Sequence, residues 1–336
     1  MLTDTTPGAQ PQAAAARAGG TALRTLVNAE SFGAGAATVT AFVVFSVWAP
    51  HFLTAQSLAS AVQVAAELGI VAIAVTLLMI AGEYDLSVGS IIGLAALVAA
   101  EALQAHWPEP LAVLAAFGAA AIVGAINGVL VAFTRAPSLI VTLAAMFVWQ
   151  GVVYVATQGF SISVTVSGVS QALFDGGFHG FAVSVIWWVA LILVLSVVLL
   201  RSRLGNHIFA TGGNPSAARS LGVPVRRIKI GLFILTALAA ALVGVIQLVR
   251  FGSADPTLGQ NVELTAIAAT VIGGTRLQGG SGTVLGTAFG CLTLGFIEVG
   301  LQLASVPTYF FQGLVGLILL AAVLVNLYLR GGQAQR

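Results

Sequence analysis

The stretch Ala81-Gly-Glu-Tyr-Asp-Leu-Ser-Val-Gly-Ser90 separates two long apolar runs, residues 68–80 and 91–100. It carries two acids, Glu83 and Asp85, although a charge at the centre of a bilayer costs about 2.5 to 3.5 kcal/mol or more. We therefore expect both acids to lie at an interface or in a polar cavity between packed membrane helices.

The same stretch contains signals for the start of a helix. Asp85 as N-cap could accept hydrogen bonds from free N–H groups of the next turn, including that of Ser87 or Val88. Gly89 and Gly93 follow at a spacing of small residues that predicts close approach by another helix. A short loop that is acidic by chance is the alternative interpretation.

The composition of the whole chain sets its class. Its 336 residues are 58% hydrophobic and only 7% charged, and the mean hydropathy is +1.03. Soluble domains carry about 25% charged residues. We therefore predict an all-α polytopic membrane protein. The single cysteine, Cys291, excludes an intramolecular disulfide and lies in an apolar run, as an inert buried thiol would.

Counting about 20 apolar residues for each membrane span predicts ten spans. They cover residues 36–54, 57–81, 88–104, 111–133, 138–157, 181–200, 229–250, 262–274, 283–303 and 308–329. Residues 1–32 are expected to form a disordered cytosolic tail, and the first span is expected to remain uncleaved. The membrane domain would then occupy residues 33–330.

The distribution of Lys and Arg predicts the orientation of these spans. With both termini in the cytosol, every basic residue except Arg250 falls on the cytosolic side, as the positive-inside rule requires. A weak internal similarity relates Gly89-Ser-Ile-Ile-Gly93-Leu-Ala95 to Gly282-Thr-Val-Leu-Gly286-Thr-Ala288, so Gly282 and Gly286 are further candidates for helix packing. Two related halves would suit a transporter, although chance explains this match equally well.

The longest segment predicted to lie in the cytosol, residues 201–228, is more than a simple loop. Asn214 followed by Pro215 starts a helix, and Gly222 stops it. A short helix outside the bilayer with small residues on one face suits docking into the groove of a partner. The alternative, a solvated basic loop, would explain the charges but not the helix start at Asn214 and the stop at Gly222.

Several function classes lack their signatures. The Gly-rich residues 273–282 do not end in the Gly-Lys-Ser/Thr of a phosphate-binding loop, and Lys229 is the only lysine of the chain. We interpret residues 273–282 as a tight reversal between two close-packed spans. The four histidines are isolated from other metal ligands. We expect no catalytic site, cofactor or metal on this chain.

Polar side chains within the predicted spans are candidates for a pathway or a gate. In addition to Glu83, Asp85 and Ser87, they are Gln63 and Glu67 on one helix face, Asn127, and Gln150 and Tyr154 on another face. Glu263 and Glu298 are expected at the outer interface, where they would be hydrated. This set favours a small neutral polar solute. The alternatives are an ion-gradient-driven secondary transporter, in which Glu67 or Asp85 would titrate, and a passive channel or scaffold.

Most of residues 57–325 resembles the permease subunits of bacterial ATP-binding cassette importers for monosaccharides, the ribose, xylose, arabinose and autoinducer-2 type. The similar blocks are Glu83-Tyr-Asp-Leu-Ser-Val-Gly-Ser90, Gly124-Ala-Ile-Asn-Gly-Val-Leu-Val131, Pro137-Ser-Leu-Ile-Val-Thr-Leu143, Gly212-Gly-Asn-Pro-Ser-Ala-Ala-Arg219 through Gly222, Gly252-Ser-Ala-Asp-Pro256, Glu263-Leu264, and Ala266-Ile-Ala-Ala269 through Gly286. Ala217, Ala218 and Gly222 resemble the Glu-Ala-Ala-x-x-x-Gly loop of the wider importer group, with Ser216 in place of Glu. Arg276 stands where the family has a small polar residue.

The resemblance implies partners for this chain. Two ATP-hydrolysing subunits would dock on the cytosolic segment, with coupling carried by Asn214, Pro215, Ser216, Ala217, Ala218, Arg219 and Gly222. A second permease copy, identical or different, would complete the pathway in the lipid of the inner membrane. A periplasmic or lipid-anchored binding protein would deliver the sugar. Nucleic acid is not expected as a partner.

Overall fold

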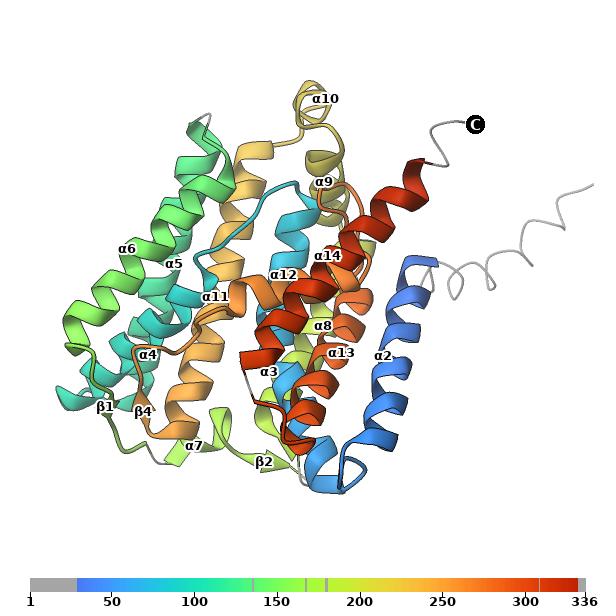
Figure 1. The fold of residues 1–336 in the computed structure, drawn as a ribbon. Coiled ribbons are helices and arrows are strands. Elements are labelled where there is room, and N and C mark those ends of the chain that lie inside the picture. The colour runs from blue at the N-terminus through green and yellow to red at the C-terminus, as the bar shows by residue number, and fades with distance from the viewer. Residues whose placement is uncertain (1–28, 135, 167, 179–180, 308, 332–336) are drawn as a thin grey trace, which may run out of the picture.

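The computed structural model describes residues 29–134, 136–166, 168–178, 181–307 and 309–331, which form one helical bundle (Figure 1). The helices are α2 (Ala29–Trp48), α3 (Ala55–Ile80), α4 (Val88–Gln104), α5 (Glu109–Phe133), α6 (Ser138–Thr157), α7 (Gly168–Phe174), α8 (Val183–Arg201), α9 (Arg203–Gly213), α10 (Pro215–Ser220), α11 (Val225–Phe251), α12 (Val262–Ile272), α13 (Val284–Leu303) and α14 (Tyr309–Gly331). The two-residue strands β1 (Ile162–Ser163), β2 (Gly177–Phe178), β3 (Phe181–Ala182) and β4 (Ser253–Ala254) pair as β1 with β4 and β2 with β3.

The structure is mostly helical, which confirms the predicted class of all-α membrane protein. Each of the ten predicted spans overlaps one long helix or one shorter apolar helix, and α7, α9 and α10 lie between spans. Six helices, α3, α5, α6, α8, α11 and α13, are long and apolar enough to cross a membrane. The described parts of α2, α4, α12 and α14 are shorter apolar helices, so the number of crossings and their orientation stay predictions. Most of the predicted tail, residues 1–28, lies outside the described residues.

The centre of the bundle is made by α3 and α11. Their central turns are mainly apolar on all faces, as expected for helices surrounded by other helices. All residues of α3 from Ala65 to Ile80 are buried except Leu68, which is partly buried. In contrast, α6 and α8 expose large apolar side chains such as Phe147 and Leu193, which suits contact with lipid.

Small residues allow a close helix contact between α5 and α11. A Cβ atom added to Gly124 would lie 2.6 Å from the carbonyl oxygen of Phe233. One added to Gly128 would lie 2.8 Å from the Cα atom of Ile230. The two backbones therefore touch directly, as small residues four apart permit within membranes. This contact fixes Asn127, which lies between the two glycines, toward the interior.

The glycines of α4 face a different partner from the one predicted. A Cβ atom on Gly89 would meet a carboxylate oxygen of Glu263 at 2.2 Å and the carbonyl of Gly259 at 2.5 Å. One on Gly93 would lie 3.2 Å from the carbonyl of Leu258. The expectation of a packed helix was wrong at this position. The non-helical segment before α12 lies here instead, because Gly259 and Asn261 have positive φ values and turn the backbone toward α4.

Glycines also bring α12 and α13 together. A Cβ atom on Gly286 would lie 2.0 Å from the carbonyl oxygen of Gly273, and one on Gly282 would lie 2.6 Å from the hydroxyl of Thr275. The intervening residues reverse the chain, as the glycine content of 273–282 predicts. Of the two similar heptapeptides, one opens α4 and the other opens α13.

Candidate functional site

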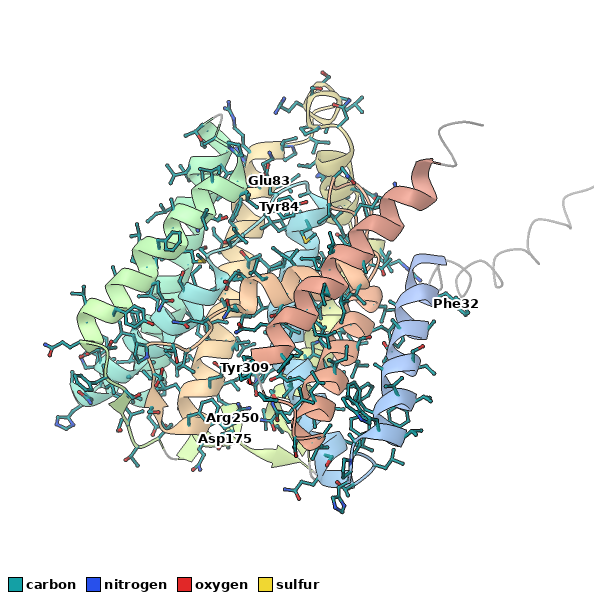
Figure 2. The ribbon with its side chains drawn as sticks, viewed as in Figure 1. Phe32, Glu83, Tyr84, Asp175, Arg250 and Tyr309 are labelled. Carbon is teal, nitrogen blue, oxygen red and sulfur yellow. The ribbon has the colours of Figure 1, made fainter. Side chains whose placement is uncertain are left out.

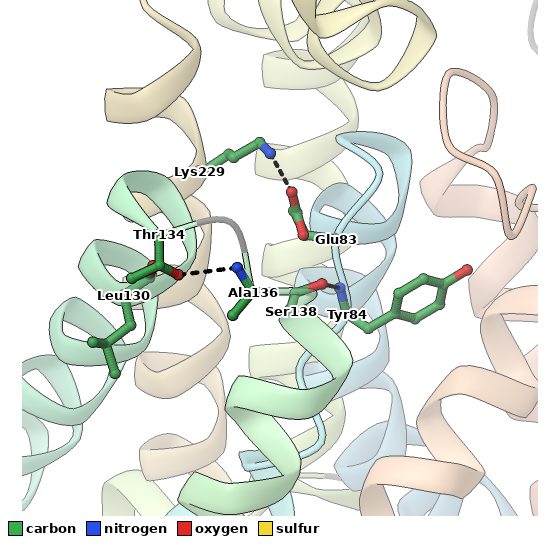
Figure 3. A network of polar contacts seen from close by, with 7 residues as sticks. All are labelled: Glu83, Tyr84, Leu130, Thr134, Ala136, Ser138 and Lys229. Carbon is green, nitrogen blue, oxygen red and sulfur yellow. Dashed lines mark hydrogen bonds and ion pairs between the residues drawn. The ribbon is translucent and has the colours of Figure 1, made fainter.

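Residues 81–87, here called the break segment, connect α3 to α4, and only its ends, Ala81 and Ser87, continue the i→i−4 hydrogen bonds of those helices. Gly82 has a φ of +84°, a left-handed conformation that suits glycine. Hydroxyl groups of α6 accept hydrogen bonds from the backbone of the segment. Ser138 Oγ accepts from Tyr84 N–H at 3.1 Å (Figure 3), and Thr142 Oγ1 accepts from Leu86 N–H at 3.1 Å. Backbone groups away from water need such partners, so α6 replaces the missing helical bonds.

The carboxylate of Asp85 is the centre of this segment and is fully buried. It accepts hydrogen bonds from the Ser87 N–H at 2.9 Å, the Ser87 hydroxyl at 2.6 Å and the Thr236 hydroxyl at 2.7 Å. The prediction that Asp85 is the N-cap was wrong, because Ser87 holds that position in α4. The predicted bond from Ser87 N–H does form. Three donors offset part of the cost of burying this carboxylate.

Ser87 and Asn127 extend the polar network. The Asn127 side-chain amide donates to Ser87 Oγ at 2.9 Å, and Ser90 Oγ donates to the Ser87 carbonyl at 2.8 Å. All three side chains are buried. The network thus joins α4, α5 and α11 through packed contacts. In this conformation these residues hold the break segment in place, and Ser90 also borders the smaller cavity described below.

Glu83 forms an ion pair with Lys229 in the first turn of α11 (Figure 3). Their side chains are 11% and 17% exposed, so water screens the pair only in part. The neighbouring Tyr84 hydroxyl donates to the carbonyl of Leu277 in the turn before α13. From the sequence, Lys229 was expected only to belong to the basic cluster of the cytosolic segment. The sequence did contain a signal for this pair. A single lysine at the start of a span needs an acidic partner, and the chain has few acids.

A junction of glycines, Gly82, Gly212, Gly279 and Gly280, connects the end of α9 to the break segment. A Cβ atom on Gly212 would lie 1.7 Å from the carbonyl oxygen of Ile80. That same carbonyl accepts from Gly280 N–H at 2.8 Å. A Cβ atom added to Gly279 would lie 2.9 Å from the Cα atom of Gly82. Three segments distant in sequence therefore touch through backbone alone.

The predicted short helix is confirmed as α10, which extends from the same end of the bundle as α9 (Figure 1). Asn214 is its N-cap, and its side-chain oxygen accepts from Ser216 N–H and Ala217 N–H at 3.1 Å each and from the Ser216 hydroxyl at 2.7 Å. Pro215 occupies the first turn, and Gly222 follows the helix with a φ of +82°.

The surface of α10 is open. Ala218 is buried, whereas Pro215, Ser216, Ala217 and Arg219 are exposed. Leu221, at the C-cap, is 84% exposed and adds an apolar side chain to this open surface. Leu221 was not among the residues predicted to couple the permease to the ATPase. Its sequence context carries no signal of its own, because single exposed apolar residues are common on protein surfaces.

A second polar cluster surrounds Glu67 near the opposite end of the bundle. Figure 2 shows Glu83 and Tyr84 near one end and Arg250 near the other. Glu67 pairs with Arg250 of α11 and accepts from Gln63 at 3.3 Å and from Gln247 at 3.2 Å. Gln63 and Glu67 thus share a face as predicted. The pairing with Arg250 was missed, because that residue was expected only to mark the outer end of its span.

Residues 252–261, here called the α12 lead, border two cavities. One, of about 180 Å³, is lined by Gln150 of α6 and by Glu263 of α12. Gln150 donates to the carbonyl of Pro256 at 2.8 Å, and Gln260 donates to the Tyr154 hydroxyl at 2.8 Å. Gln150 and Tyr154 therefore both bind the lead. The other cavity, of about 520 Å³, includes Glu67 and Glu298 in its wall.

The expectation that Glu263 is hydrated was wrong, because only 8% of the residue is exposed. Its carboxylate lies against Gly89, where the absence of a side chain leaves room for it. Glu298 is partly buried in the cavity wall. Within the described ranges, no three His, Cys, Asp or Glu side chains are grouped so that they could hold a metal ion.

Comparisons with known proteins agree with one another on the kind of protein. Residues 57–323 match the family described as "Branched-chain amino acid transport system / permease component". The ribose import permease protein RbsC of Escherichia coli (strain K12) is 36% identical over 289 residues, which cover 84% of this chain and 89% of the relative. The L-arabinose ABC transporter permease protein AraH of Azospirillum brasilense is 34% identical, over 86% of this chain and 85% of its own.

The xylose transport system permease protein XylH of Escherichia coli (strain K12) is 31% identical, over 85% of this chain and 89% of its own. No solved structure matches the chain. ATP hydrolysis in such importers belongs to a separate subunit, which agrees with the lack of a phosphate-binding loop here. The buried network at Asp85, the exposed helix α10 and these similarities lead to one conclusion: the chain belongs to the family of inner-membrane permease subunits of bacterial ATP-binding cassette importers.

Proposed function

We propose that this permease carries a neutral monosaccharide similar to ribose into the cell. The observation that carries the proposal is the 36% identity to a ribose import permease over 84% of the chain. Relatives named for arabinose and xylose support the same substrate class. The family description names branched-chain amino acids instead, which makes such an amino acid the second candidate.

In the proposed topology both termini lie in the cytosol, and the ten helices at the predicted spans, within residues 33–330, form the membrane domain. α12 has 11 residues and is about 16 Å long, which is half of the roughly 30 Å of a bilayer core. The reversal before α13 completes that crossing on the cytosolic side, and the α12 lead lies outside the bilayer core at the other end of α12. The break segment likewise precedes α4. Non-helical backbone at membrane depth is tolerated where protein buries it, as it does in the break segment, where Gly82 is the one exposed residue.

In the proposed assembly, ATP-hydrolysing subunits dock on α10 within the cytosolic segment, residues 201–228. The exposed side chain of Leu221 and the open face of α10 support this role. A second permease copy, identical or different, completes the pathway through the lipid. A periplasmic or lipid-anchored binding protein delivers sugar at the opposite end, near Arg250. The substrate side of the permease then faces the α12 lead and its two cavities.

The proposed coupling route begins at α10 and ends at the break segment. When the ATPase subunits close, α10 and α9 move together, because Asn214 belongs to both as C-cap and N-cap. Gly212 passes the displacement to Ile80, since the two backbones touch without an intervening side chain. The break segment and Asp85 then shift relative to α11. In this scheme Glu83, Asp85, Ser87 and Asn127 gate the pathway, and Gln63, Glu67, Gln150 and Tyr154 contribute to its wall.

The test is uptake by proteoliposomes that contain the permease, its ATPase subunit and its binding protein. We expect ATP-dependent uptake of at least one of D-ribose, D-xylose and L-arabinose, and none of L-leucine. Omission of the ATPase subunit should abolish uptake. Uptake of leucine alone would favour the second candidate. Uptake driven by an imposed proton or sodium gradient without ATP would show a secondary transporter and contradict the proposal.

A further inference from the structure

The cavity of about 520 Å³ beside Glu67, here called the Glu67 cavity, lies among α3, α11, α12, α13 and α14. Its volume falls within the roughly 300 to 1,000 Å³ of small-molecule sites. It shares no residue with the buried network around Asp85. The coupling route described above does not use it. The Glu67 cavity is therefore large enough to hold a small molecule, and the coupling route gives it no role.

The wall of the Glu67 cavity is polar and carries charges of both signs. The carboxylates of Glu67 and Glu298 and the guanidinium of Arg250 border it. Ionisable groups on membrane-spanning helices are costly, and they mark functional paths by default. The pair of Glu67 with Arg250 is held by further bonds from Gln63 and Gln247, so its geometry is fixed before any ligand arrives.

One hydrogen-bond acceptor in this wall has no partner. The Gln247 side-chain nitrogen donates to Glu67, whereas its carbonyl oxygen is buried and accepts no hydrogen bond from the described residues. A buried acceptor without a donor costs free energy. Because this oxygen is buried in the described conformation, a ligand hydroxyl in the cavity would supply that donor after a shift of the Gln247 side chain. Phe311 adds an apolar surface to the same wall, against which the C–H face of a sugar ring can pack.

We propose that the Glu67 cavity is a binding subsite for a neutral, hydroxyl-rich solute, with Gln247 and Glu298 as its hydrogen-bond acceptors and Arg250 as a donor. The inference rests on the proposed sugar-import function and assigns a place to its substrate within a single permease subunit. A polyhydroxyl solute suits both kinds of polar group, because each hydroxyl both donates and accepts. An anionic solute would meet two carboxylates and only one guanidinium.

The first test uses the reconstituted importer with radiolabelled D-ribose, D-xylose and L-arabinose. Gln247→Leu removes the acceptor at similar volume, and we expect the initial rate of uptake to fall by about tenfold. Glu298→Leu should have a similar effect, whereas Glu298→Gln, which keeps an acceptor, should retain more uptake. The matched control is Gln104→Leu, an exposed glutamine outside the cavity that should transport like the wild type. Thermal unfolding of each variant identifies loss of fold.

The second test asks directly whether sugar occupies the cavity. Cys291, the single cysteine of the chain, is buried, so an introduced cysteine can be followed by alkylation with a polar maleimide. The same three sugars should slow the alkylation of Thr265→Cys, in the cavity wall. They should leave Thr165→Cys, in an exposed loop, unchanged. This readout does not depend on transport activity.

The outcomes separate the subsite from the function on which it rests. Wild-type uptake of a sugar combined with wild-type rates for Gln247→Leu, and no protection of Thr265→Cys, would overturn the subsite alone. Protection of Thr265→Cys by added lipid and not by sugar would also overturn it, since lipid would be the occupant. Failure of the wild type to transport any of the three sugars would overturn the proposed function, and with it sugar as the ligand.

Discussion

The hydroxyl of Thr236 in α11 donates a 2.7 Å hydrogen bond to the carboxylate of Asp85, 151 residues earlier in the break segment. Both side chains are fully buried. α11 begins only a few residues after α10, the proposed docking helix. This bond therefore joins the helix that follows the docking site to the segment that interrupts α3 and α4.

Thr236→Val should destabilise the protein by about 1 to 3 kcal/mol, because it leaves one oxygen of a buried carboxylate without that donor at nearly constant volume. The measurement is the midpoint of thermal unfolding in detergent. Thr40→Val is the matched control, since the Thr40 hydroxyl is exposed and bonds only within its own helix, to Ala36. Equal midpoints for both variants would show that the bond to Asp85 contributes nothing.

Replacing both members of the Glu83–Lys229 ion pair should lower the stability of the protein by less than the sum of the two single replacements. Lys229→Met or Glu83→Gln alone leaves a mostly buried charge or dipole without its partner. We expect about 1 to 3 kcal/mol of destabilisation, less than the about 3 to 5 kcal/mol of a fully buried pair. The double variant should lose less than the sum, with a coupling of about 0.5 to 3 kcal/mol. Additive losses in unfolding experiments would mean that the two residues act independently.

Gly212→Ala tests the glycine junction with an unusually close control. A methyl group at Gly212 would lie 1.7 Å from the Ile80 carbonyl, whereas one at the adjacent Gly213 meets nothing within 4 Å. Overpacking of this kind costs typically about 1 to 3 kcal/mol, and more where backbone must move. We expect Gly212→Ala to reduce the yield of monodisperse protein or to uncouple ATP hydrolysis from uptake, and Gly213→Ala to resemble the wild type. Normal coupling in a well-expressed Gly212→Ala variant would refute the junction.

Leu221→Ser tests the docking surface at α10. Because Leu221 is 84% exposed, the change should leave the unfolding midpoint of the isolated permease unaltered. Loss of an apolar anchor at an interface should weaken binding of the ATPase subunit by about tenfold, equivalent to about 1.4 kcal/mol. Affinity is measured by titration of the ATPase subunit on permease in nanodiscs. Leu173→Ser, in α7, is the control, and equal affinities for the two variants would place docking elsewhere.

The sequence was sufficient to predict the class, the positions of the ten main helices and the short helix at residue 215. Each of these follows from local signals. Hydropathy sets the spans, and an Asn-Pro start with a glycine stop sets α10. The same holds for Gln63 with Glu67 and for Gln150 with Tyr154, because a spacing of four residues places two side chains on one helix face.

Long-range partners were not predictable from local signals. The pairings of Glu83 with Lys229, Glu67 with Arg250 and Asp85 with Thr236 depend on how distant helices are arranged. The error at Gly89 has the same origin. Small residues predict that something approaches closely, but a helix and a non-helical segment both satisfy that requirement. Here the α12 lead provides the contact, and its positive-φ residues, Gly259 and Asn261, are the signal for a turn.

Asp255, in the α12 lead, should make the loop that contains it sensitive to pH. Hydrogen bonds from the Thr257 hydroxyl, the Thr257 N–H at 2.8 Å and the Ser161 hydroxyl at 2.7 Å hold the pKa of this carboxyl below its usual value. A lowered pKa in the folded state means that ionised Asp255 stabilises the loop above its unfolded pKa of about 4. That stabilisation is lost as the pH falls through the lowered folded value. Hydrogen exchange in peptides spanning residues 253–258, corrected for the intrinsic rate, should therefore rise between about pH 5 and pH 3. Asp255→Asn should remove this pH dependence, and Thr257→Val, which keeps the acid but removes a donor, should reduce it. An Asp255→Asn variant with the wild-type pH profile would show that a different group controls the loop.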